Sequence, residues 1–209
     1  MSKKDIYETI LGEMSSLLDT NNFKALKKES CLIRKTLSGN DKINFAVYDN
    51  FNQYSLGVVF TKRVEEAEKI FHLSSLTDKK YQDQSWTIHL PLYFFDETIG
   101  SVNFKFPVNT LSDLNAISKN LASLCHSKVI PLLDELEDGH NLYSFLWSLI
   151  EKNLISANME SNYAHGLILS HLYAPQDLAG HIAFVEDKLS NFVSLSQSRL
   201  TNLINYLRQ

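Results

Sequence analysis

The strongest constraint on the fold lies in residues 42–61, with the sequence KINFAVYDNFNQYSLGVVFT. Two runs of β-branched and aromatic residues flank a polar cluster at residues 49–53. Apolar residues alternate with smaller or polar ones in both runs, and a strand turns successive side chains to opposite faces. The Asp and Asn residues between the runs tolerate the positive φ angles of tight turns. This stretch therefore predicts an antiparallel β-hairpin with one buried face.

Periodic patterns predict further elements on both sides of the hairpin. Before it we expect an amphipathic helix over 3–19 and a strand over 31–37. After it we expect a short helix over 64–71, with Glu65, Glu66, Glu68 and Lys69 facing solvent, and a polar loop over 77–84. The remaining predicted elements are strands over 85–95 and 100–106 and helices over 110–127, 129–136, 141–153, 158–173 and 177–207, the last as one helix or two.

The spacing of apolar residues changes near residue 109, from the two-residue period of a strand to the 3.6-residue period of a helix. The predicted fold class is therefore α+β, with an N-terminal helix plus an antiparallel, meander-like sheet, followed by an all-α C-terminal part. We expect an α+β domain over residues 1–108 and a helical domain or subdomain over 109–209. Residues 1–80 have a slight excess of basic residues and residues 81–209 an excess of acidic ones. This difference in charge supports a boundary between the two predicted domains.

Composition excludes several classes of protein. The chain has 209 residues, 44% of them hydrophobic and 21% charged, which is typical of a globular core. A net charge of −4 argues against a dedicated nucleic-acid binder. No apolar run approaches the roughly 20 residues that span a bilayer, so we expect no membrane partner. The start lacks the apolar segment of a signal peptide, and we expect a cytoplasmic protein.

The sequence names no catalytic, cofactor-binding or metal-binding residue. The seven histidines show no metal-binding spacing such as HExxH. No glycine-rich phosphate loop and no GxSxG nucleophile motif is present either. We therefore expect ordinary surface or capping histidines, no cofactor and no metal. The absence of these motifs favours a binding protein over an enzyme.

The two cysteines predict free, buried thiols in a reducing compartment. Cys125 precedes His126, but adjacent helical residues point about 100° apart, so a packed thiol is the preferred interpretation. Cys31 precedes Arg34 and Lys35, and a reactive thiol is the alternative there if the residue is exposed.

Charged clusters are interpreted as solvated surface. Four pairs of basic residues occur, Lys3–Lys4, Lys27–Lys28, Lys62–Arg63 and Lys79–Lys80. All have acidic neighbours, which favours separate solvent-exposed charges over a surface that binds nucleic acid. The acidic run at 134–138 is typical of a solvated helix end. Small residues at 158–189, such as Ala164 and Gly166, predict two closely packed helices, with a peptide groove as the functional alternative.

The front of the chain resembles a bacterial family called domain of unknown function 4304. The shared plan is an N-terminal amphipathic helix, a Phe followed by basic residues, a strand and a hairpin, and the matching residues here are Phe23, Lys24, Lys27 and Lys28. The second arm of the hairpin carries the step Leu56–Gly57–Val58. Members tend to have Gly before the Phe, where this chain has Asn22. The resemblance covers about the first half of the chain and implies a fold without implying an activity.

The leading functional hypothesis is a non-catalytic protein that binds another protein, as immunity or accessory proteins of bacterial toxin systems do. The alternative is a small-molecule-binding protein or enzyme with a site on the sheet face near Trp86. The expected ligand or partner surface consists of four residues, Tyr48, Tyr54, Trp86 and His89, because pockets combine apolar walls with a few polar groups. RNA binding is a third hypothesis, and the oligomeric state stays open.

Overall fold

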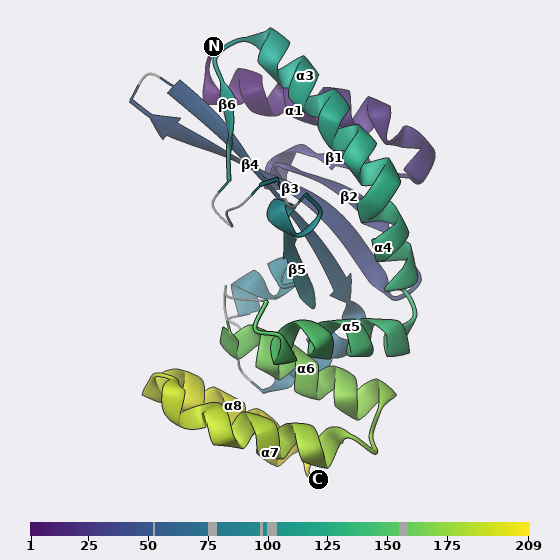
Figure 1. Cartoon of the computed structure of the whole chain (residues 1–209), viewed down its shortest axis with the longest axis vertical. Coiled ribbons are helices and arrows are strands. Elements are labelled where there is room, and N and C mark those ends of the chain that lie inside the picture. Colours follow the sequence, from purple (N-terminus) through teal and green to yellow (C-terminus); the bar gives the residue numbers. More distant parts are fainter. Residues whose placement is uncertain (52, 75–78, 97, 100–103, 155–158) are drawn as a thin grey trace. The chain divides into compact units, whose positions relative to one another are not determined.

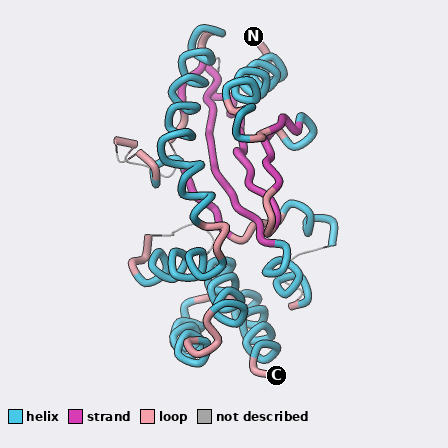
Figure 2. The backbone as a smooth tube through the Cα atoms, turned by 90° about the vertical axis from the view of Figure 1, so that its right-hand side faces the viewer, coloured by secondary structure: helices cyan, strands magenta, loops and turns pink. Residues whose placement is uncertain are grey.

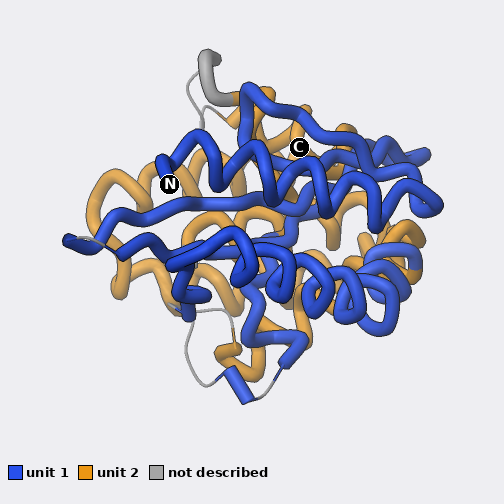
Figure 3. Tube along the Cα trace, turned by 90° about the horizontal axis from the view of Figure 1, so that it is seen from above, with its two compact units in different colours: residues 1–62, 89–134 blue, residues 63–88, 135–209 orange. Residues whose placement is uncertain are grey.

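A computed structural model describes residues 1–51, 53–74, 79–96, 98–99, 104–154 and 159–209. The chain forms two compact units whose segments alternate along the sequence (Figure 3). Unit 1 contains residues 1–62 and 89–134, and unit 2 contains residues 63–88 and 135–209. The sequence predicts a division into domains after residue 108, and that division stays a prediction.

The fold is α+β, with an N-terminal helix, an antiparallel sheet and a helical C-terminal part, as the sequence predicts (Figure 1). The described strands are β1 (Lys24–Leu26), β2 (Cys31–Lys35), β3 (Gly39–Asn50), β4 (Gln53–Val64), β5 (Ile88–Pro91) and β6 (Phe106–Val108). The described helices are α1 (Lys3–Leu17), α2 (Glu65–Leu73), α3 (Leu111–Leu124), α4 (Ile130–Glu135), α5 (Gly139–Glu151), α6 (Met159–Tyr173), α7 (Leu178–Lys188) and α8 (Ser194–Leu207).

The strands run side by side in the order β1-β2-β3-β4-β5, and β6 also pairs with β4 (Figure 2). β1 and β2 pair antiparallel, as do β2 and β3 and also β4 and β6. The hairpin predicted at 42–61 is confirmed as β3 and β4, which extend beyond the predicted ends. One sheet face carries the buried side chains of Ile43, Phe45 and Val47 on β3.

In unit 1, helix α1 packs against α3 and against β1, β2 and β3. Capping boxes begin both helices: Ser2 and Asp5 bond each other's backbone N–H groups in α1, and Thr110 and Asp113 do so in α3. Such reciprocal bonds satisfy donors that a helix start leaves free. The apolar stripe of α1 is buried and comprises Ile6, Ile10, Leu11 and Met14. One face of the sheet is therefore covered by helices.

In unit 2, helix α6 is the central element, because it contacts α2, α5, α7 and α8. Residues 162–170 of α6 are all buried, which explains why this helix has no polar face. Gly166 makes the contact with α5 possible, since a Cβ there would lie 2.9 Å from Cδ1 of Ile150 and 3.3 Å from the ring of Trp147. α6 does contact α7, as the sequence predicts for 158–189, but the close approach at Gly166 is to α5 instead.

Several predicted elements differ in extent from the observed ones. The strand predicted at 85–95 is limited to β5. Of the one or two helices predicted at 177–207, the structure has two, α7 and α8, separated by residues 189–193. β1 was not predicted. The strand predicted at 100–106 falls largely on residues 100–103, outside the described residues, and Pro107 lies within β6 instead of ending a strand. Residues 79–84 form a 3₁₀ helix where a loop was expected.

The break predicted between the helices over 110–127 and 129–136 takes the form of a π-helical turn, Cys125–Val129, which joins α3 to α4 just before Pro131. A proline ring clashes with the carbonyl four residues earlier in an α-helix and has no N–H to donate. A wider π turn immediately before the proline relieves this conflict without ending the helix.

Candidate functional site

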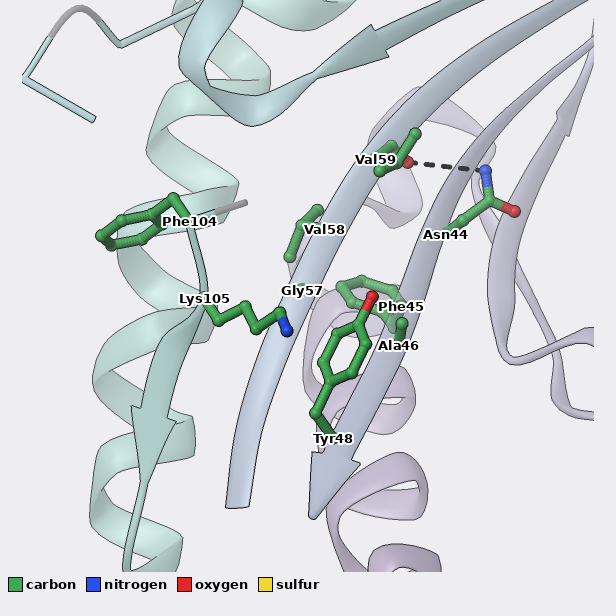
Figure 4. Close-up of a pocket in the computed structure, with 9 residues that line it drawn as sticks. All are labelled: Asn44, Phe45, Ala46, Tyr48, Gly57, Val58, Val59, Phe104 and Lys105. Atoms are coloured by element: carbon green, nitrogen blue, oxygen red, sulfur yellow. Dashed lines mark hydrogen bonds between the residues drawn. The ribbon is translucent and has the colours of Figure 1, made fainter. Parts of the chain in front are cut away.

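A hollow opens on the sheet of unit 1, over β3 and β4 (Figure 4). Its volume is about 130 Å³. The lining residues come from β3, from β4 and from the segment before β6, and they are Asn44, Phe45, Ala46, Tyr48, Gly57, Val58, Val59, Phe104 and Lys105. Segments distant in the sequence therefore meet at one exposed site.

Gly57 shapes the floor of the hollow. A Cβ at this position would lie 3.0 Å from Cε2 of Tyr48. The absence of a side chain therefore lets the Tyr48 ring approach β4 closely, and a glycine within a strand is typical of such a close approach.

Lys105 adds a positive charge to the hollow, since its Nζ lies 3.6 Å from the centroid of the Tyr48 ring (Figure 4). A cation over an aromatic face is attracted by the ring, by roughly 0.5–1 kcal/mol at an exposed site. Tyr48 is 41% exposed and Phe104 37% exposed, so the site presents aromatic surface to solvent. The hollow thus combines an apolar floor, two rings and one ammonium group.

The four residues of the expected surface lie in different places. Tyr48 lines the hollow. Tyr54 lies on β4 opposite Val108 of β6, in the alternating set that also contains Leu56. His89 is half-buried on β5, where burial lowers its pKa. Trp86 belongs to unit 2 and is 37% exposed. The residues lining the hollow include only Tyr48 of the four, and a common role for the other three stays a prediction.

Unit 2 contains a buried ionisable cluster around Glu68 of α2, and here the sequence expectation was wrong. Glu68 was expected on the solvated side of its helix, yet it is 0% exposed. Its Oε1 lies 2.9 Å from Nε2 of His165 and accepts a 2.8 Å hydrogen bond from the Thr87 hydroxyl. His72 Nε2 lies 3.6 Å from the other carboxylate oxygen.

His165, expected as an ordinary surface or capping residue, is 1% exposed. Its Nδ1 lies 2.8 Å from the Ser161 carbonyl oxygen, which can only accept a hydrogen bond. Its Nε2 faces the Glu68 carboxylate, which also only accepts when ionised. Nδ1 also lies 3.2 Å from the Ser161 hydroxyl, so both ring nitrogens of His165 have hydrogen-bond partners. The ring also stacks on Phe71, with 4.3 Å between the centroids.

The electrostatics of Glu68 follow from these contacts. Burial would raise the pKa of its carboxyl, because it disfavours the charged form. The charge of His165 and the hydrogen bonds from His165, Ser85 and Thr87 outweigh burial and lower the pKa of Glu68 to about 2. Burial lowers the pKa of His72, with the Glu68 charge opposing it. The cluster joins α2 to α6 and exposes neither Glu68 nor His165 to a substrate.

A second buried cluster holds the sheet of unit 1 to α4. The carboxylate of Asp41 on β3 accepts hydrogen bonds from Arg34, at 2.6 Å and 3.1 Å, and from Lys62, at 3.2 Å. Lys62 also donates to the Leu133 carbonyl oxygen at 3.2 Å, and Arg34 pairs with Asp134 at 2.8 Å. Burial raises the pKa of Asp41, and the attraction of Lys62 and Arg34 opposes that rise.

The solvated interpretation of the pair Lys62–Arg63 was therefore wrong. Lys62 is 0% exposed and Arg63 8% exposed. Arg63 donates to the Glu65 carboxylate and to the backbone oxygens of Gln82 and Ser85. Within the acidic run, Asp134 pairs with Arg34, and Asp138 caps α5 by accepting from the backbone N–H groups of residues 140 and 141.

Both cysteines are free and buried, as expected. Burial raises the pKa of Cys31 to about 11, although Lys42 opposes the rise, and it raises the pKa of Cys125 to about 12. Thiolates are the reactive form, so the alternative of a reactive Cys31 has no support from its surroundings.

Among the described residues, no group of three or more His, Cys, Asp or Glu side chains has a metal-binding arrangement. Within the same residues, no helix is long and apolar enough to cross a membrane. The chain matches no known family model, no curated protein and no solved structure. The resemblance to domain of unknown function 4304 therefore stays a prediction.

Proposed function

We propose that this chain is a non-catalytic binding protein whose protein partner docks on the hollow of unit 1. The observation that carries the proposal is the stack of Lys105 over Tyr48, above the space left by Gly57. Aromatic rings next to a cation, on a sheet face that is not buried, are typical of the anchor points of protein interfaces.

The size of the hollow favours one side chain over a free metabolite. Pockets for small ligands usually have volumes of about 300–1,000 Å³. A volume of about 130 Å³ is closer to that of a single ring, since an engineered cavity of about 150 Å³ accepts benzene. The partner we propose inserts an apolar or aromatic side chain and places a carboxylate near Lys105.

An accessory or immunity-like role would use such a surface without any catalytic group, and we keep it as part of the proposal. The enzyme or small-molecule alternative near Trp86 requires a ligand that raises the melting temperature through mass action. A thermal-shift screen against metabolites and metals therefore separates the two classes of function.

The docking site is tested by quantitative capture of partners from the native host with the purified chain. Tyr48→Ala removes one ring, and Gly57→Val fills the floor of the hollow. Leu37→Ser is the matched control, because Leu37 is 101% exposed and is not among the lining residues. Circular dichroism verifies that each variant is folded.

We expect one protein to be recovered in stoichiometric amount by the wild type and the control. Its recovery should fall about tenfold or more with either hollow variant, the loss typical of an anchor residue. Equal recovery by all four proteins would overturn the docking site, and recovery of no stoichiometric partner would overturn the function.

A further inference from the structure

We infer that a second copy of this chain caps the hollow, by inserting Phe51 from the tip of its own β3–β4 hairpin. The inference rests on the proposed binding role of the same hollow and adds a form of regulation to it. A self-capped hollow is closed to the partner until the two copies separate.

The hairpin tip has the features of an inserting element. It projects beyond the helices of unit 1 (Figure 1). Phe51 is 101% exposed and has a φ of 46°, in the left-handed region that bulky residues seldom occupy. This large apolar side chain is thus not covered by the part of the chain that the structure describes. Its full exposure also shows that Phe51 does not fill the hollow of the copy that carries it.

The chemistry of the tip matches the hollow. A benzyl ring suits a space of about 130 Å³ with an aromatic and aliphatic lining. Asp49, two residues before Phe51, is exposed, and its carboxylate is opposite in charge to Lys105, which lies over the Tyr48 ring. Phe51 and Asp49 therefore supply both groups that the hollow is suited to bind.

The positions of tip and hollow permit a reciprocal arrangement. Phe51 and Tyr48 are three residues apart, which corresponds to about 10 Å along a strand. A two-fold axis that passes between them places the tip of each copy over the hollow of the other. Such an isologous contact uses the same patch twice and closes on itself as a dimer.

The inference is tested by sedimentation equilibrium of the full chain over a wide range of concentrations, up to the order of 1 mM, because small interfaces are weak. We expect a concentration-dependent dimer. Phe51→Ser should raise the dissociation constant about tenfold or more, the loss typical of an anchor residue. Leu37→Ser, which removes an equally exposed side chain from a different turn, should leave it unchanged.

A charge exchange tests the pairing of Asp49 with Lys105. Asp49→Lys and Lys105→Asp should each weaken the dimer, and the double variant should recover most of the affinity because the opposite charges meet again. A wild type that stays monomeric at every concentration would overturn the inference. So would equal weakening by Leu37→Ser, or a double variant no stronger than the single ones.

The outcomes for the two proposals are separate. A monomeric chain whose partner is lost with Tyr48→Ala overturns the self-capping and leaves the proposed function in place. A dimer that depends on Phe51, together with recovery of no partner, overturns the proposed function and supports the dimer. If both hold, Phe51→Ser should increase partner capture, since the hollow is then free.

Discussion

Glu68 on α2 and His165 on α6 lie 97 residues apart in sequence and share a buried hydrogen bond, with 2.9 Å between Oε1 and Nε2. The contact lies entirely within unit 2 and makes the stability of that unit depend on pH. Both tryptophans, Trp86 and Trp147, also belong to unit 2. Tryptophan fluorescence therefore reports the unfolding of this unit directly.

Acid is expected to destabilise unit 2 in two stages. His72 has a folded pKa below its ordinary value of 6.5, so protons favour the unfolded chain, and the unfolding free energy falls as the pH drops below about 6.5. The pKa of Glu68 falls from 4.5 to about 2 on folding, so its contribution is lost as the pH falls through that interval. Glu65, whose pKa is lowered by Arg63, acts in the same direction. Urea unfolding followed by tryptophan fluorescence at a series of pH values measures this, and a constant unfolding free energy from pH 7 to 3 would contradict it.

Glu68→Gln is expected to lower the unfolding free energy of unit 2 by about 3 kcal/mol, because it removes the buried carboxylate that contacts His165 and Thr87. Glu66→Gln on the same helix is the control, since Glu66 is exposed, and its effect should stay within about 0.5 kcal/mol. The Glu68 variant should also lose the part of the pH dependence below about pH 4.5. Similar free energies for the two variants would show that the buried pair contributes little.

Gly166→Ala and Gly180→Ala are expected to have opposite effects on stability. The new Cβ at 166 would meet Ile150 at 2.9 Å, and such overpacking costs about 1–3 kcal/mol. No atom lies within 4 Å of a Cβ at 180, and alanine in an open helical position stabilises by about 0.5–1 kcal/mol. Thermal unfolding followed by tryptophan fluorescence compares them, and a change of the same sign in both would refute the tight contact of α6 with α5.

The two thiols are expected to react slowly with a disulfide reagent in the folded protein. A pKa of about 11 for Cys31 in place of 9.0 lowers its thiolate fraction about a hundredfold, and a pKa of about 12 for Cys125 lowers it about a thousandfold. Burial adds a steric barrier. Unfolding in urea should release two fast-reacting thiols per chain. A rapid reaction in the absence of urea would indicate that the surroundings of one cysteine open readily.

Local sequence patterns were sufficient to predict those helices and strands whose signal lies within a few residues. The alternation in 42–61 specified a hairpin because side chains on a strand face a core or solvent in turn, whatever the core contains. The helix predicted from residue 110 agrees with the N-cap Thr110 of α3, a local signal because its partner Asp113 is only three positions away. The same logic fails for β1, because its three residues are too few to show a repeated alternation.

Local patterns could not predict contacts between residues that are distant in sequence. Glu68 follows Val64 and precedes Phe71 at helical spacing, so it lies on the apolar stripe of α2, and this was the available signal for its burial. The identity of His165 as its partner requires the fold. Tyr48 was named as a surface residue, but Lys105 was not, because only the chain path before β6 brings that cation to the ring.

The alternation of the two units along the sequence affects how the chain folds as it is synthesised. Residues 63–88 appear early, but the rest of unit 2 begins only at residue 135. At roughly 5–20 residues per second, Glu68 waits roughly 5–20 s for His165 to be added. The buried pair can therefore form only after α6 has been added, so unit 2 gains this contact late in synthesis.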